Sequence, residues 1–285
     1  MSKTANARIA FFGTPRFAVQ VLEEMEKAGI LPNLVITMPD RPAGRGLVPK
    51  ASPVKVWAEG KDIPVAESFD TLAKRDWDLF IVAAYGKVLP FSLLKLPHAG
   101  TLNVHPSLLP KYRGPSPVES QILADEKDIG VSIMLVDEEL DHGPIVKQEA
   151  IQLEAWPLPA SALEERLARA GVALLAEIIP TWIQEAAYDE EGADDRTLIP
   201  EPQAHSQATF TKKIEKEDGH IDLSADPRQN YLKFCAYDGW PGTYFFKGSK
   251  RIKIADAKFS NGEFRISRVI PEGKREMAYE DFLRS

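Results

Sequence analysis

Short apolar runs alternate with helix-like stretches through the first half of the chain. Continuous apolar runs predict buried strands at 8–12, 34–37, 79–84, 101–105 and 131–136. Between the first two runs, Phe17, Val21, Leu22 and Met25 repeat at helical spacing, and Gly29 ends that predicted helix. Strands that alternate with helices favour parallel βαβ units with right-handed crossovers. The pattern therefore predicts an α/β fold with a Rossmann-like, mostly parallel sheet.

The pattern changes in the second half of the chain. Ser161 and Glu164 form a capping box that opens a long helix, and an acidic, proline-bearing stretch then predicts a surface linker at 188–205. Beyond it the sequence predicts a helix near 227–236 and short strands at 243–246, 251–259 and 263–270. Short strands separated by turn residues favour a small antiparallel β-barrel. We therefore expect two domains, 1–187 and 206–285.

Two polar side chains interrupt the apolar run TLNVH at 101–105. Side chains two positions apart in a strand point to the same face, so Asn103 and His105 should stand together. Asp141 lies in the loop after the next predicted strand. Ligands of open α/β sheets collect beyond the carboxyl ends of the strands, so the three groups could converge there.

An amide, an imidazole and a carboxylate together suit acyl transfer to an amine. The amide can donate to an oxyanion, the imidazole can move a proton, and the carboxylate can stabilise the imidazolium. Ser107 and Cys235 are poorly placed as protein nucleophiles, so the substrate should bring its own. Taken singly, a histidine such as His105 near a strand end is more often a hydrogen-bonded structural residue, and Asp141 before His-Gly-Pro is more often a turn residue. Only their joint placement points to catalysis.

Composition adds limits on the cellular setting and on cofactors. The 285 residues are 44% apolar and 27% charged, which is typical of a globular protein that buries a core. The N-terminal MSKTANA has no apolar core of a signal peptide, and no apolar run is long enough for a membrane span. A single cysteine and no zinc-type spacing predict a cytoplasmic protein without a metal.

Charge is uneven along the chain and allows a polyanionic partner. The formal net charge is −7, yet the part after residue 204 is slightly basic. A loop at 39–50, PDRPAGRGLVPK, carries Arg41, Arg45 and Lys50 without any apolar pattern. This loop is either an ordinary solvated loop or a finger that touches phosphates.

Several motifs, in this order, resemble the methionyl-tRNA formyltransferases. They are FFGTPRFA at 11–18, PDRPAGRG at 39–46, AAYGKVLP at 83–90, LNVHPSLLPKYRG at 102–114, VDEELDHG at 136–143 and WPGT at 240–243. The resemblance covers nearly the whole chain. The NxHxSLLP and LDxG patterns are typical of folate-dependent formyltransferases as a class, and the PDRPAGRG loop with WPGT points to the tRNA enzymes.

The resemblance implies an activity and a set of site residues. The enzyme would transfer the formyl group of 10-formyltetrahydrofolate to the α-amino group of initiator methionyl-tRNA, as a cytoplasmic monomer. Asn103, His105 and Asp141 look like the catalytic residues. The folate would lie near two segments, Ser107, Leu108, Leu109 and Pro110 in one, and Tyr85, Gly86 and Val88 in the other. Arg41 and Arg45 match the tRNA-contacting loop, and the C-terminal domain would be OB-like.

Three features depart from this family pattern. Pro106 stands where the tRNA enzymes usually have a small residue, and it is more typical of the purine-pathway relative. His142 stands where threonine is common, and the C-terminal domain is short. The main alternative is a nucleotide-sugar N-formyltransferase. A non-catalytic tRNA- or folate-binding protein is the alternative from another class.

Overall fold

The computed structural model describes residues 7–43, 48–189 and 197–284, and divides them into two compact units. The first unit comprises Met1–Pro115, Asp128–Ile151 and Glu164–Phe210, and the second comprises Ser116–Lys127, Gln152–Leu163 and Thr211–Ser285. The expected division placed everything before residue 188 in one domain. Two short segments of that region, Ser116–Lys127 and Gln152–Leu163, belong to the second unit, where Pro117–Leu123 packs with Pro227–Ala236.

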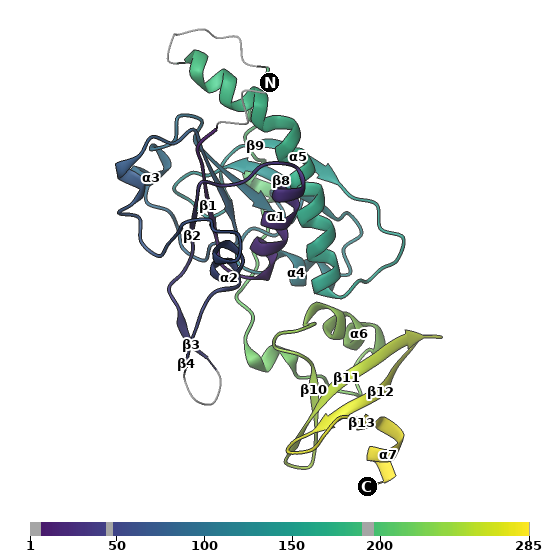
Figure 1. Ribbon diagram of the computed structural model, residues 1–285. Coiled ribbons are helices and arrows are strands. Elements are labelled where there is room, and N and C mark those ends of the chain that lie inside the picture. The colour runs from purple at the N-terminus through teal and green to yellow at the C-terminus, as the bar shows by residue number, and fades with distance from the viewer. Residues whose placement is uncertain (1–6, 44–47, 190–196, 285) are drawn as a thin grey trace. The chain divides into compact units, whose positions relative to one another are not determined.

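A seven-stranded sheet forms the first unit (Figure 1). Its order is β5-β2-β1-β6-β7-β8-β9. The strands are β1 (Ile9–Gly13), β2 (Leu34–Ile36), β5 (Val65–Ala66), β6 (Leu79–Ala83), β7 (Thr101–His105), β8 (Gly130–Leu135) and β9 (Ile145–Ala150). The strands from β5 to β7 are parallel, as the alternating pattern predicted. The prediction of a parallel strand at 131–136 was wrong, since β8 runs antiparallel to β7 and to β9.

One face of this sheet is covered by α1 (Arg16–Lys27) and α5 (Ala160–Asp189). The two helices lie side by side in Figure 1, and Arg16 on α1 pairs with Glu165 on α5. Gly171 lets α5 approach β7 closely, because a Cβ there would lie 2.6 Å from Val104 Cγ1. Val104 therefore points to α5, which leaves Asn103 and His105 on the other face.

The opposite face carries an aromatic core. Phe12, Phe80 and Tyr85 pack there with tilted or edge-to-face rings, together with Trp77 and leucines from the shorter elements. The register places Val82 of β6 beside Asn103. The polar pair of β7 thus continues the row of side chains that builds this core. The remaining short elements of the unit are α2 (Pro53–Glu59), α3 (Phe91–Leu94) and 3₁₀ turns at Leu72–Lys74 and His205–Gln207.

A two-stranded hairpin, β3 (Arg41–Ala43) and β4 (Val48–Lys50), extends away from the sheet (Figure 1). Arg41 is exposed on it, whereas Arg45 lies outside the described residues. Lys55 pairs with Asp40 and with Glu67, at 3.0 and 2.8 Å, which ties the base of the hairpin to α2 and the region after β5.

The second unit is built on a four-stranded antiparallel sheet. Its strands are β10 (Tyr244–Lys247), β11 (Lys250–Ser260), β12 (Glu263–Pro271) and β13 (Met277–Ala278). Its helices are α4 (Pro117–Leu123), α6 (Pro227–Ala236), α7 (Tyr279–Arg284) and a 3₁₀ turn at Lys216–Gly219. The predicted fold class, a mostly parallel α/β sheet followed by a small β domain, is confirmed, while closure into an OB-like barrel stays a prediction. No helix in the described ranges is long and apolar enough to cross a membrane.

Candidate active site

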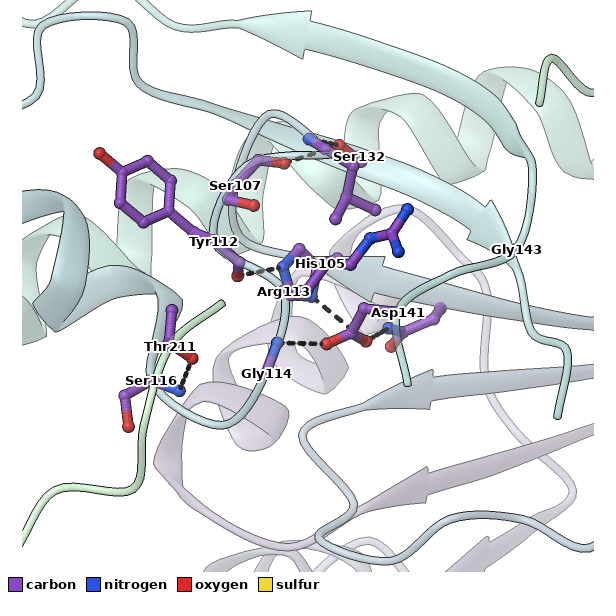
Figure 2. A network of polar contacts seen from close by, with 12 residues as sticks. His105, Ser107, Tyr112, Arg113, Gly114, Ser116, Ser132, Asp141, Gly143 and Thr211 are labelled. Carbon is purple, nitrogen blue, oxygen red and sulfur yellow. Dashed lines mark hydrogen bonds and ion pairs between the residues drawn. The ribbon is translucent and has the colours of Figure 1, made fainter. Parts of the chain in front are cut away.

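Strand β7 ends at the carboxyl edge of the parallel part of the sheet and carries the first two site residues. Asn103 is half-buried and His105 is only 3% exposed. The predicted shared face is found: both side chains approach the same carboxylate, that of Asp141. Asn103 Nδ2 donates to Asp141 Oδ1 at 3.4 Å, and His105 Nδ1 lies 3.6 Å from the same oxygen. Figure 2 shows the imidazole beside this carboxylate.

Asp141 reaches this position by a route that the strand pattern did not predict. Because β8 is antiparallel to β7, it ends beside Leu102 at the far end of β7. The loop 137–143 must therefore return along the sheet to place Asp141 next to His105. Asp141 has a positive φ of 50°, a conformation that aspartate tolerates better than most residues. Its other oxygen, Oδ2, accepts a 2.7 Å hydrogen bond from Gly114 N–H.

Each ring nitrogen of His105 faces an oxygen atom. Nε2 lies 3.1 Å from the carbonyl oxygen of Tyr112, which can only accept, so Nε2 carries a hydrogen. A second proton would sit on Nδ1, facing Asp141. Tyr112 also has a positive φ, of 61°, which turns its carbonyl toward the ring (Figure 2). Tyr112 O and Asp141 Oδ1 thus face the two nitrogens of the ring, at 3.1 and 3.6 Å.

Asn103 keeps one donor for a ligand. A carboxamide nitrogen carries two hydrogens. One of them points to Asp141, so the second can serve an oxygen bound at the same place. The arrangement can therefore offer a neutral N–H and a positive charge to one developing oxyanion.

The SLLP segment after β7 is fixed by one buried serine. Ser132 Oγ of β8 donates to Ser107 O (Figure 2). The same oxygen accepts from Leu109 N–H. Ser107 is fully buried and its hydroxyl donates to Lys111 O at 2.7 Å, so it supports the turn and does not act as a nucleophile. Leu108 and Pro110 are half-buried, and Leu109 is 4% exposed. Their expected contact with folate stays a prediction.

The segment that follows β6 presents a mixed surface at the same edge of the sheet. Tyr85 is buried and packs edge-to-face on Phe12, while Thr14 Oγ1 donates to its carbonyl at 2.8 Å. Gly86 has a φ of 90° and is exposed, and Val88 is 63% exposed. The buried ring anchors the segment and leaves the neighbouring residues open to a ligand, which suits the folate contact predicted for Tyr85, Gly86 and Val88.

Four residues around the site were missed by the sequence analysis: Tyr112, Arg113, Gln203 and His205. Arg113 is 3% exposed and donates through Nε and Nη2 to Gln203 Oε1, at 3.1 and 2.6 Å. Gln203 belongs to the stretch expected to be a surface linker, yet it is 5% exposed and lies in the first unit. No local signal marks it, since a glutamine between a proline and an alanine has no periodic neighbours. For Arg113, the only local signal is an arginine beside a glycine, as in YRG at 112–114, which is a weak hint of a structural role.

The described residues supply neither a reactive cysteine nor a metal cluster at this place. Cys235 lies in the second unit, and burial raises the pKa of its thiol to about 11. Among the described residues, no group of three or more histidine, cysteine, aspartate or glutamate side chains is gathered as metal ligands. What the described residues do gather at this edge of the sheet is an amide, an imidazole and a carboxylate, those of Asn103, His105 and Asp141.

Comparison with known families places this site in a defined class of enzymes. The family model described as "Formyl transferase" matches residues 7–179, and the model "Formyl transferase, C-terminal domain" matches residues 213–267. The chain belongs to the formyl transferase family. The two models cover the parallel sheet with its site and the C-terminal sheet as far as residue 267, within β12.

Among its relatives are methionyl-tRNA formyltransferases of bacteria. That of Chloroflexus aurantiacus is 39% identical over 264 residues, covering 90% of this chain and 81% of the relative. That of Thermus thermophilus is 38% identical and covers 93% and 86%. A solved N-formyltransferase of Helicobacter canadensis, bound to folinic acid and dTDP-3-aminofucose, shares the fold with a TM-score of 0.60 at 16% identity, covering 95% of this chain and 98% of its own.

Proposed function

We propose that the protein transfers the formyl group of 10-formyltetrahydrofolate to the α-amino group of initiator methionyl-tRNA. The observation that carries the proposal is the convergence of Asn103, His105 and Asp141 at the sheet edge of a formyl transferase fold. The bacterial relatives named methionyl-tRNA formyltransferase support tRNA as the acceptor, because they match over most of the chain. The predicted cytoplasmic location and monomeric state belong to the proposal as well.

Two segments would hold the folate. The exposed residues after Tyr85 and the turn at 107–110 flank the end of β7, where the site residues lie. When bound there, 10-formyltetrahydrofolate supplies an electrophilic formyl carbon on N10. Segment 107–110 is held rigid by Ser132 and by Gln148, which donates to Leu109 O at 3.0 Å. A rigid wall of this kind would fix the formyl group in reach of Asn103.

Asn103 and His105 would stabilise the oxyanion that forms when the neutral amine attacks the formyl carbon. The free amide hydrogen of Asn103 would donate to that oxygen, and the imidazolium would supply positive charge. Asp141 would hold the imidazolium in place. The 3.6 Å contact of Nδ1 with Asp141 is looser than the 3.1 Å contact of Nε2 with Tyr112 O. We therefore assign proton delivery to the leaving N10, directly or through water, to the Nδ1–H of His105. The neutral Nδ1 would then take the proton that the attacking amine loses, which restores the imidazolium.

Positive charge on both units supports a tRNA acceptor. Arg41 is exposed on the β3–β4 hairpin, and Arg45 belongs to the same predicted tRNA loop. In the second unit, Arg251, Lys253 and Lys258 are exposed on β11. Cations on a protruding hairpin and on a strand face suit contacts with a phosphate backbone.

The deciding experiment offers the purified protein two kinds of acceptor with one donor. Charged initiator methionyl-tRNA and amino-sugar nucleotides, including dTDP-3-aminofucose, are each incubated with 10-formyltetrahydrofolate. We expect formyl transfer to the tRNA. Transfer to the sugar nucleotide alone would replace the proposal with the nucleotide-sugar alternative.

Substitution of the hairpin arginines tests the acceptor separately from the donor. Arg41→Ala and Arg45→Ala should raise the KM for tRNA while the KM for the donor stays unchanged, because only phosphate contacts are lost. Arg75→Ala removes an exposed arginine elsewhere in the first unit and serves as the matched control. Unchanged tRNA kinetics in both hairpin variants would exclude this loop from tRNA binding.

A further inference from the structure

Gln203 connects the catalytic loop to the turn that follows β7. Its side-chain nitrogen donates to the carbonyl oxygens of Asp141 and Gly143, at 3.0 and 2.7 Å. Its side-chain oxygen accepts both contacts from Arg113. Both hydrogens of the amide and its oxygen are thus used, and the side chain is 5% exposed. A glutamine held on every side in this way has one orientation.

The loop that carries Asp141 needs such support. The loop follows β8, and its two ends are joined by the hydrogen bond from Leu135 N–H to Pro144 O. Gly143 packs so tightly that a Cβ there would lie 2.0 Å from Leu135 O. Asp141 adopts a left-handed conformation, which is sparsely populated and persists only where the surroundings fix it. The two carbonyl groups that Gln203 binds belong to Asp141 itself and to this tight glycine.

Arg113 stands at the other end of the same connection. The residues on either side of it touch the site: Tyr112 O accepts from His105, and Gly114 N–H donates to Asp141. Arg113 N–H is held by Thr209 O at 2.9 Å. One turn thus contacts the imidazole, the carboxylate and Gln203. A shift of the Arg113 side chain would move the groups that orient both His105 and Asp141.

A histidine pair fastens the end of the loop to the same segment. The rings of His142 and His205 are stacked, with centroids 4.1 Å apart and planes 6° from parallel. His142 Nδ1 lies 2.7 Å from Asp137 Oδ2, and Arg113 Nη2 donates to His205 Nδ1 at 2.9 Å. Residues 203 and 205 therefore hold the loop at Asp141, His142 and Gly143 together.

We propose that Gln203, through Arg113 and the carbonyls of Asp141 and Gly143, is the positioning residue that sets the place of the Asp141 carboxylate beside His105. The inference rests on the proposed function for its kinetic effect, but the geometry it describes exists without substrate. Gln203 touches no reacting atom. Its effect should appear in kcat, because a misplaced carboxylate weakens transition-state stabilisation without removing a substrate contact.

Two substitutions of Gln203 test this connection. Gln203→Met keeps the size of the side chain and removes all four hydrogen bonds. Gln203→Glu keeps an acceptor for Arg113 and places a carboxylate opposite two carbonyl oxygens. We expect kcat to fall by about 10- to 100-fold in both variants, with KM for donor and tRNA unchanged. Gln207→Met, an exposed change in the next turn of the same segment, is the matched control and should retain wild-type kcat.

A spectroscopic measurement distinguishes positioning from loss of structure and from failure of the proposed function. The nitrogen-15 resonances of the His105 ring, assigned by their absence in His105→Asn, report the contact with Asp141 in the free protein. We expect them to shift in Gln203→Met and, by less, in His205→Ala, while Gln207→Met leaves them unchanged.

The outcomes are separable. A wild-type protein that does not formylate tRNA defeats the proposed function, and the His105 resonances still decide the role of Gln203. Unshifted His105 resonances in Gln203→Met would overturn the positioning role. So would a wild-type kcat of the Gln203→Met variant, once the wild-type protein has been shown to formylate tRNA. If Gln203→Met does not fold, Gln203→Glu decides between the same two results, because it too removes the N–H donors to the carbonyls of Asp141 and Gly143.

Discussion

Nδ1 of His105 lies 3.6 Å from Oδ1 of Asp141, although the strand that leads to Asp141 runs away from His105. The carboxylate is therefore brought to the imidazole by a returning loop and not by the strand itself. The distance between the two side chains therefore depends on the conformation of the loop 137–143 and on the residues that hold this loop, as well as on the sheet.

Asp141→Asn tests the charge at this contact with little change of shape. Asparagine also tolerates a positive φ and keeps an oxygen for Gly114 N–H. We expect the rate of formyl transfer to fall by roughly 10²- to 10³-fold, because the imidazolium loses its counter-charge. Single-turnover assays measure this change. Asp137→Asn removes a carboxylate that bonds His142 and should have a smaller effect; equal losses in the two variants would argue against a special role for Asp141.

Gly171→Ala tests the packing that orients β7. The added Cβ would lie 2.6 Å from Val104 Cγ1 and 3.1 Å from Val131 Cγ2. We expect a loss of about 1–3 kcal/mol in the free energy of unfolding, since overpacking outweighs the roughly 1 kcal/mol gain in helix propensity. Denaturant unfolding measures the change. Arg166→Ala, at an exposed position of the same helix, should be close to neutral, and a Gly171→Ala protein as stable as wild type would show that α5 can shift away from β7.

Asp125→Asn tests an acid-sensitive contact within the second unit. Hydrogen bonding from Arg228 is the main reason that the pKa of Asp125 falls to about 2, with Lys127 and Trp156 adding to it. A carboxyl whose pKa is lower in the folded state stabilises the fold above its unfolded value and loses that effect as pH falls toward 2. We expect Asp125→Asn to lose about 1 kcal/mol near neutral pH, since the pair is partly exposed.

The check on this prediction is the free energy of unfolding measured against pH. The difference between wild type and Asp125→Asn should shrink as the pH falls from about 4 toward 2. Glu263→Gln, which breaks the exposed pair with Arg265, should show almost no difference at any pH. A pH-independent difference for Asp125→Asn would mean that the carboxyl acts through shape alone.

The thiol of Cys235 should react slowly in the folded protein. It is 2% exposed, and desolvation raises its pKa to about 11, so little thiolate is present near neutral pH. We expect modification by Ellman's reagent to be slow in buffer, faster as the pH rises toward 11, and fast in guanidinium chloride. Because this is the only cysteine, the rate reports opening of the second unit. Immediate stoichiometric labelling of the native protein would contradict the burial.

Local pattern was enough for part of the site and not for the rest. The two-residue period of a strand placed Asn103 and His105 on one face, because that period follows from the backbone alone. The direction of β8 was missed, since an apolar run reads alike in both directions. Gln203 and Arg113 were missed because they meet across 90 residues. Such a contact depends on the finished fold. Arg45 lies outside the described residues, so its predicted role remains open to the kinetic test.

The second unit is assembled from three separate stretches of chain, and this limits how the protein can be shortened. Helix α4 packs with α6, and its Val118 and Ile122 are buried. Deleting everything after residue 210 would remove α6 while α4 stayed behind with an exposed apolar surface. A fragment cut at the apparent linker is therefore no free-standing catalytic module. The C-terminal segment serves as the folding partner of residues that lie far ahead of it in the chain.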